Sequence, residues 1–267
     1  MSPLVLVLLD WALMAGAMFI LWRWQLRSGE ADGVDLGWTV GLGLAAVLYA
    51  FGLDRGLPER RLLVAGLAVL WSGRLAIHLW KRVRTPGEDG RYARLRAEWG
   101  PDAPRRFLRF YQIQALSVPL LAVHFMLAML HPAGELRLWD LLGALVVLLS
   151  IGGEALADRQ LAAWKRDPAN EGRTWRRGLW RYSRHPNYFF EWLHWVGYSV
   201  IAVGWVWWPA TLVAPAIMYV LVRHVTGIPP TEAQSVRSRG EDYRKYQRTT
   251  NAFFPGPPRP DPREAAG

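Results

Sequence analysis

Long apolar stretches separated by charged segments constrain this chain more than any other feature of its sequence. A bilayer-crossing helix needs about 20 mostly apolar residues, and seven stretches have that character. They lie at residues 4–24, 36–53, 62–80, 111–130, 138–157, 188–206 and 209–226. The sequence therefore predicts an all-α fold, an integral membrane bundle of about seven transmembrane helices.

The placement of Lys and Arg predicts how this bundle is oriented. The segment 81–109 carries nine basic and four acidic residues, 158–187 carries eight and three, and the part after Thr226 carries seven and five. With seven spans these three segments lie on one side, which the positive-inside rule makes cytoplasmic. The N-terminus is then outside and the C-terminus cytoplasmic. Because the charges alternate with apolar stretches, they predict membrane boundaries and no nucleic-acid partner.

The chain is expected to form one transmembrane domain over residues 1–254, followed by a disordered Pro-rich tail over 255–267. Trp22 and Trp24 close the first stretch as an interfacial anchor, so we interpret it as a retained helix. The absence of Cys excludes disulfides and thiolate metal sites. The six His residues are too scattered to predict a metal centre.

A polar string, WRYSRHPNYFFEW at residues 180–192, stands at the start of the sixth apolar stretch. Pro186 suits the first turn of a helix, so the span is expected to begin there. Helix starts present free N–H groups and a partial positive charge, which suit a phosphate. Arg181, Arg184 and His185 are expected to add donors to such a ligand, and Tyr182 and Tyr188 are expected to stack on it or hydrogen-bond to it.

Within the same string, Asn187 and Glu191 are four residues apart and share one face of the predicted helix. They fall on the hydrocarbon side of the membrane boundary, where ionisable groups are costly and usually functional. The alternative is that Arg and aromatic residues simply decorate the boundary. That alternative explains Trp180 and Trp192 but leaves the two polar residues unexplained.

A second group of ionisable residues ends the fifth apolar stretch. Glu154 and Asp158 are one helical turn apart, and Lys165 follows two turns later. Carboxylates in this position suit ribose hydroxyls, while Lys165 suits a phosphate. The alternative is an ordinary charged face on a helix leaving the membrane.

These residues resemble a known family. The string GLWRYSRHPNYFFEWLHWVGY, with ADRQLAAWK before it and GIPPTEA and GEDYRKYQRTTNAFFP after it, is similar to bacterial members of the steroid 5-alpha-reductase-like superfamily. VDLGW, WSGRLAIHLWKR and GEDGRY in the N-terminal half also fit this pattern. The superfamily includes sterol reductases and isoprenylcysteine carboxyl methyltransferases.

The resemblance implies a bacterial inner-membrane reductase whose cofactor cavity opens to the cytoplasm and binds NADPH. Glu154 stands where the steroid enzymes have Asn. Matched residue by residue, the implied cofactor-binding positions are Asp158, Lys165, Tyr182, Asn187 and Glu191.

Three residues in the N-terminal half are candidates for catalysis. The steroid reductases polarise a ketone with a Glu and a Tyr, but the Tyr position falls here on Trp71. Asp35 is the nearest acid, and Arg74 and His78, one turn apart in an apolar stretch, are candidates to replace the Tyr. Such groups could stabilise enolate charge. Alternatively, Arg74 pairs with Asp35 for structural reasons alone.

Three functions remain open. The first is NADPH-dependent reduction of a carbon–carbon double bond conjugated to a carbonyl in a lipophilic, steroid- or isoprenoid-like substrate. The second is an S-adenosylmethionine-dependent methyltransferase of a lipophilic substrate, and the third is a non-enzymatic lipid-binding protein. The Arg-rich surroundings favour the reductase, because NADPH carries an extra phosphate whereas S-adenosylmethionine is cationic.

Overall fold

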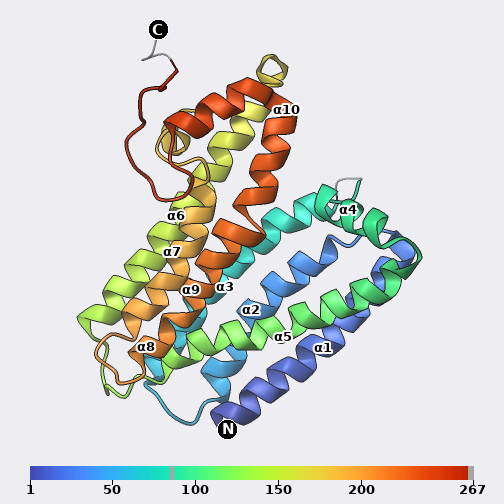
Figure 1. The fold of residues 1–267 in the computed structure, drawn as a ribbon. Helices are drawn as coiled ribbons and strands as arrows, with labels where there is room; N and C mark the ends of the chain where they lie inside the picture. The colour runs from blue at the N-terminus through green and yellow to red at the C-terminus, as the bar shows by residue number, and fades with distance from the viewer. Residues whose placement is uncertain (85–86, 264–267) are drawn as a thin grey trace. The chain divides into compact units, whose positions relative to one another are not determined.

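The computed structural model describes residues 1–84 and 87–263, and helices account for most of this part of the chain (Figure 1). The prediction of an all-α fold is confirmed, since no strand occurs within these two ranges. Six helical segments are long and apolar enough to cross a membrane: Pro3–Ser28, Gly33–Gly52, Pro58–Val83, Gly90–Met129, Leu138–Lys165 and Trp208–Thr249.

The sixth predicted span is shorter than expected. Helix α7 covers Pro186–Ile201, 16 residues, which at about 1.5 Å per residue is shorter than the hydrocarbon core of about 30 Å. The predicted end at residue 206 is wrong. The chain turns after Ile201, and Gly204 has a left-handed φ of 88° that a helix cannot accommodate.

The helices divide into two compact units. Unit 1 comprises Met1–Leu141 and Ala202–Trp208. Its helices are α1 (Pro3–Ser28), α2 (Gly33–Gly52), α3 (Pro58–Val83), α4 (Gly90–Trp99) and α5 (Ala103–Met129). Helix α2 packs against α1, α3 and α5, and α1 also packs against α5.

Unit 2 comprises Leu142–Ile201 and Pro209–Gly267. Its helices are α6 (Leu138–Lys165, whose first four residues belong to unit 1), α7 (Pro186–Ile201), α8 (Trp208–Thr211), α9 (Val213–Val220) and α10 (Ile228–Thr249). A π-helical turn, Leu221–Val225, links α9 to α10. Turns of this kind commonly occur at functional sites.

Local sequence signals explain where several helices begin and end. Helices α1 and α3 each have Pro in the first turn, where its missing N–H has no helical partner to lose. Helix α1 ends at Gly29, whose φ of 78° forms a left-handed cap.

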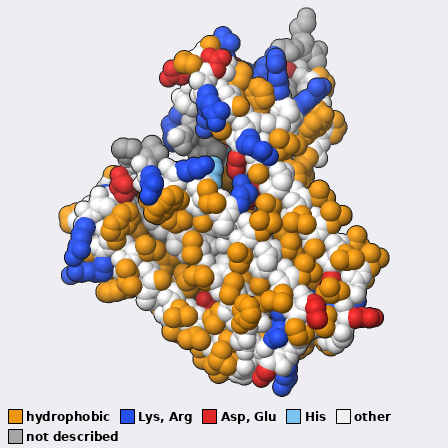
Figure 2. All heavy atoms as spheres, turned by 180° about the vertical axis from the view of Figure 1, so that it is seen from behind, with side chains coloured by type: hydrophobic (Ala, Val, Ile, Leu, Met, Phe, Trp, Pro, Cys, Tyr) orange, Lys and Arg blue, Asp and Glu red, His pale blue; other side chains and the backbone are white. Residues whose placement is uncertain are grey.

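The outer faces of the long helices are strongly apolar. Helix α1 exposes Leu4, Leu13 and Ile20 at 67%, 58% and 68%. On the face drawn in Figure 2, broad areas of exposed hydrophobic side chains lie beside clusters of Lys and Arg. Exposed apolar area of this extent is what a lipid-facing surface requires.

Several buried polar residues inside unit 1 are paired with one another. Tyr49 on α2 donates a hydrogen bond of 2.8 Å to Asp10 on α1. Arg60 and Asp140 are fully buried and form an ion pair of 2.6 Å. The Arg60 guanidinium also donates to the carbonyls of His131, Ala133 and Glu135, so its charge is well compensated.

The Pro-rich tail has defined contacts as far as the structure describes it. Arg248 on α10 makes a bidentate pair with Asp261, with both N–O distances 3.0 Å. The Arg259 N–H donates to the Thr249 carbonyl at 2.8 Å. Residues 255–263, for which the sequence predicts disorder, therefore lie against α10. Residues 264–267 of that predicted tail lie outside the described residues.

Close packing of α6 and α7 yields a testable prediction. A Cβ added at Gly143 would lie 2.5 Å from the Gly197 carbonyl oxygen and 2.9 Å from the Ile201 nitrogen, whereas one added at Gly152 meets nothing within 4 Å. We expect Gly143→Ala to destabilise the protein by about 1–3 kcal/mol, because backbone must move to admit the methyl group.

Thermal unfolding in detergent micelles measures this effect. Gly152→Ala, on the same helix, is the matched control and should unfold at or above the wild-type temperature, since Ala favours helix. Equal melting temperatures for Gly143→Ala and wild type would contradict the close approach of α6 and α7.

Candidate functional site

The start of α7 organises the polar string that the sequence singles out. The helix begins at Pro186, as predicted. Just before it, the Ser183 hydroxyl accepts a hydrogen bond of 3.1 Å from the His185 N–H and donates one of 2.8 Å to the Phe253 carbonyl. Trp180 is buried, and its indole N–H donates to the Ala157 carbonyl of α6 at 3.0 Å. The string is therefore fixed to α6 on one side and to the C-terminal segment on the other.

Asp158 and Asn187 meet between α6 and α7. The Asn187 side-chain N–H donates to an Asp158 carboxylate oxygen at 3.4 Å, a weak hydrogen bond. The Asn187 carbonyl oxygen is buried and has no hydrogen-bond partner among the described residues. Since buried polar groups are nearly always paired, this oxygen is available to a ligand.

Two further carboxylates flank this pair along the same helices. Glu154 lies one turn before Asp158 on α6 and is 5% exposed. Glu191 lies one turn after Asn187 on α7 and is half-buried. Three carboxylates and an amide therefore occur within two turns of the two helices, a composition suited to ligand hydroxyl and amide groups.

Arg184 and His185, for which the sequence predicts phosphate binding, are bound to α10. The Arg184 Nε donates to Glu232 at 2.6 Å, and its Nη1 donates to the carbonyls of Gln247, at 2.9 Å, and Thr250. His185 Nε2 lies 3.1 Å from the same Glu232 oxygen. Most of the Arg184 donors thus already have acceptors within the protein.

Glu232 is the residue that sequence reasoning missed. Burial alone would raise its pKa, but hydrogen bonds from His185 and Arg184 lower it to about 2. Burial in turn lowers the pKa of His185 and opposes the effect of Glu232. The signal for Glu232 in the sequence was a single acidic residue in the GIPPTEA segment, which has basic neighbours.

The two Tyr residues of the string differ in their surroundings. Tyr188 stacks on His185, with ring centroids 5.4 Å apart and planes 8° apart, and its hydroxyl lies 3.2 Å from the Thr231 hydroxyl. Tyr182 is 46% exposed, and its carbonyl accepts from the Gly256 N–H. Tyr188 belongs to the packed core of this region, whereas Tyr182 presents its ring to the surroundings.

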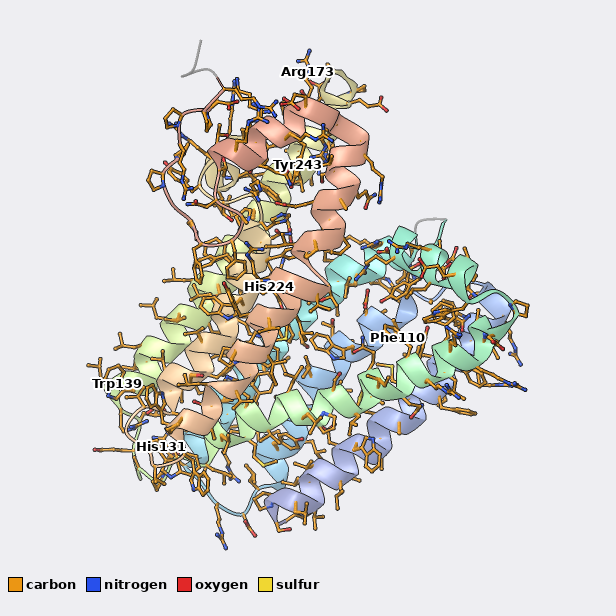
Figure 3. The ribbon with its side chains drawn as sticks, viewed as in Figure 1. Phe110, His131, Trp139, Arg173, His224 and Tyr243 are labelled. Carbon is orange, nitrogen blue, oxygen red and sulfur yellow. The ribbon has the colours of Figure 1, made fainter. Side chains whose placement is uncertain are left out.

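Lys165 lines a pocket at the end of α6, with a cavity volume of about 340 Å³. Arg173 and Arg239 also line it, as do Asp167 and Glu171, so it contains three cationic and two acidic side chains. Figure 3 shows Arg173 at the same end of unit 2 as Tyr243. Trp164 and Trp175 form an aromatic wall with centroids 5.0 Å apart, and their indole nitrogens have no hydrogen-bond partner within the described chain.

The catalytic candidates lie in unit 1, and the structure adds Tyr92 to them. The Asp35 carboxylate accepts from the Tyr92 hydroxyl at 2.7 Å and from Arg91 at 2.9 Å. Both oxygens of Asp35 are thus held by residues of α4. On α3, Arg74 is half-buried and His78 is exposed. Tyr92 lies in the GEDGRY segment, which contributes to the sequence-based prediction only as part of the family resemblance.

No cluster of three or more His, Cys, Asp or Glu side chains that could hold a metal ion occurs within residues 1–84 and 87–263.

Comparisons with known proteins identify the family of this chain. A family model described as a protein of unknown function, DUF1295, matches residues 21–250, and the chain belongs to that family. Uncharacterized protein C594.04c of Schizosaccharomyces pombe is 30% identical over 207 aligned residues. That match covers 67% of this chain and 59% of the yeast protein. No solved structure matches the chain.

The Glu232 network predicts a specific pH dependence. Because its pKa is lower in the folded protein than its ordinary value of 4.5, its contribution to stability is complete above about pH 5 and is lost as the pH falls towards 2. We expect Glu232→Gln to cost about 2–3 kcal/mol at pH 7, and the difference from wild type to shrink between pH 5 and 3.

Thermal unfolding of both proteins in detergent across this pH range provides the measurement. Glu241→Gln on the exposed face of α10 is the matched control and should have little effect, since exposed ion pairs contribute little. A Glu232→Gln deficit that stayed constant from pH 7 to 3 would argue against the buried network.

Proposed function

We propose that this protein is a membrane-embedded, NADPH-dependent reductase of a carbon–carbon double bond conjugated to a carbonyl in a lipophilic substrate. The observation that carries the proposal is the buried, unpaired carbonyl oxygen of Asn187 beside Asp158. It lies where the apolar stretches of α6 and α7 carry a group of polar residues, which are costly in a membrane and usually functional.

The residues of unit 2 suit the parts of NADPH. The Asn187 carbonyl oxygen can accept from an amide N–H, and Asp158, Glu154 and Glu191 can accept from ribose hydroxyls. Lys165, with the other cations of its pocket, suits a phosphate group. When bound, NADPH supplies a hydride. Asp158 and Asn187 bind the cofactor and orient it.

The charge of this region favours NADPH over S-adenosylmethionine. Lys165, Arg173 and Arg239 line one pocket together with Asp167 and Glu171, so cations outnumber anions there by one, and this balance suits a phosphate group better than a cationic cofactor. In our proposal the pocket at the end of α6 faces the cytoplasm, and the N-terminus lies outside. The substrate enters from the lipid. The resemblance to steroid 5-alpha-reductase-like proteins of the bacterial inner membrane also supports NADPH as the cofactor.

Cofactor binding tests the proposal directly. We expect purified protein to bind NADPH, and Asn187→Ala and Asp158→Ala each to weaken binding by about 1–3 kcal/mol, the usual cost of losing a buried polar contact. Titration followed by NADPH fluorescence gives the affinity, and a parallel titration uses S-adenosylmethionine.

Gln234→Ala and Asp102→Ala are matched controls, since both side chains are exposed and neither makes a side-chain hydrogen bond. Unchanged NADPH affinity in both site variants, in folded protein, would refute the site. Binding of S-adenosylmethionine with no binding of NADPH would favour the methyltransferase.

For catalysis we propose that Asp35, Arg74 and His78 include the group that stabilises charge on the substrate's carbonyl oxygen, and that Tyr92 positions Asp35. A fixed donor in a dry site contributes roughly 10²–10³-fold to turnover. We expect Asp35→Asn or Arg74→Ala to lower turnover by this factor while NADPH affinity stays nearly unchanged.

Single-turnover assays with steroidal and non-steroidal enones measure this effect for Asp35→Asn, Arg74→Ala, His78→Ala and Tyr92→Phe. Glu59→Gln, also in unit 1, is the control and should retain full activity. Full activity in all four variants would place the reacting group elsewhere in the chain. Failure of Asp35→Asn and Arg74→Ala to fold would favour a structural role.

A further inference from the structure

A second basic pocket lies in unit 2 and shares no lining residue with the candidate cofactor site. Its cavity volume is about 320 Å³. It is formed where the turn before α7 meets the end of α10 and the C-terminal segment. The lining residues are Arg176, Arg177, Gly178, Arg181, Thr249, Thr250 and Pro258.

Two of its three guanidinium groups have no counter-charge among the described residues. Arg176 is paired with Asp242 at 2.6 Å and lies over the Tyr246 ring. Arg177 and Arg181 are exposed, and within residues 1–84 and 87–263 neither side chain has an ion-pair or hydrogen-bond partner. The pocket therefore carries an uncompensated positive charge of about two, and its planar donor groups suit phosphate oxygens.

The wall that carries these Arg residues is held firmly. Between them, Trp180 is anchored to α6 by its indole N–H, and the Leu179 N–H donates to the Gln160 side chain at 3.0 Å. Gly178 has φ of 60°, and a Cβ there would lie 2.5 Å from the Gln160 side chain. Because this turn is fixed, the backbone of Arg177 and Arg181 is held in place on one side of the pocket.

The opposite wall is formed by the end of α10 and the C-terminal segment. The Arg259 N–H bond to the Thr249 carbonyl holds Pro258 against the pocket. The Thr250 hydroxyl makes no hydrogen bond within the described residues, so it can donate to a ligand. The pair Arg248–Asp261 fixes the same segment farther along.

The position of the pocket indicates where its ligand comes from. Arg181 is five residues before Pro186, at which α7 enters its apolar sequence. In the proposed topology this is the level of the lipid headgroups on the cytoplasmic side, where basic residues attract anionic lipids.

We propose that this pocket binds a phosphate group, supplied by the headgroup of an anionic membrane lipid. The site is additional to the proposed cofactor site and does not depend on the enzymatic function. The phosphate oxygens accept from Arg177 and Arg181, and Thr250 provides a neutral donor.

The test uses the full chain in detergent, titrated separately with short-chain phosphatidylglycerol, phosphatidylcholine with the same acyl chains, and inorganic pyrophosphate. We expect phosphatidylglycerol to bind more tightly than phosphatidylcholine and the binding to weaken with added salt. The double variant Arg177→Ala/Arg181→Ala should lose affinity for phosphatidylglycerol by at least roughly tenfold.

The charge-matched control Arg105→Ala/Arg237→Ala removes two exposed Arg residues that have no partners among the described residues, and it should bind like wild type. Equal phosphatidylglycerol affinity in wild type and the Arg177/Arg181 variant would overturn the proposal. If wild type and the control variant bind pyrophosphate tightly and the Arg177/Arg181 variant does not, the phosphate site is supported, but its ligand is a soluble phosphate and not a lipid.

NADPH titration of the same variants separates this proposal from the proposed function. We expect NADPH affinity to be the same in the Arg177→Ala/Arg181→Ala variant and in the control. A loss of NADPH binding by this variant, with lipid binding retained, would assign the pocket to the cofactor and overturn the lipid proposal.

Discussion

Glu232 joins the start of α7 to α10 through Arg184 and His185, and the geometry of the candidate site depends on this interaction. Three hydrogen bonds converge on one carboxylate, from Arg184, His185 and Gln247. Without Glu232, the 10% exposed Arg184 side chain would be a largely buried cation with only carbonyl partners. Since uncompensated buried charge is strongly destabilising, the network fixes the turn at which α7 begins. Asn187 is in the first turn of that helix, so its position depends on the same contacts.

Much of the fold could be predicted from sequence because the bilayer fixes the length and apolar character of its helices. The predicted stretch 36–53 became Gly33–Gly52, and Pro186 began α7 as expected. The error at the end of α7 arose because residues 202–206 are as apolar as the helix before them. Hydropathy cannot register that Gly204 adopts a left-handed conformation.

The candidate site was predictable where its residues are close in sequence or share a helix face. Spacing placed Asn187 with Glu191 and Glu154 with Asp158, since residues four apart are neighbours on a helix. The contacts that hold these helices together link distant residues: Arg184 with Glu232, and Asp35 with Tyr92. No periodicity in the sequence encodes such pairs, because they depend on how helices pack. The C-terminal segment shows the same limit, since its Pro-rich composition predicts disorder while Arg248 and Arg259 hold it against α10.

Polar residues among these apolar helices are of two kinds, and the distinction separates structure from function. Tyr49 with Asp10 and Arg60 with Asp140 bind each other within their own unit. Such pairs compensate the cost of burial and need no ligand. Asn187 differs, because its amide N–H reaches Asp158 only weakly while its buried oxygen has no partner among the described residues. A helix pair that needed only stability would be served better by an apolar residue at this position. In our proposal this unmet hydrogen bond is made to the bound cofactor.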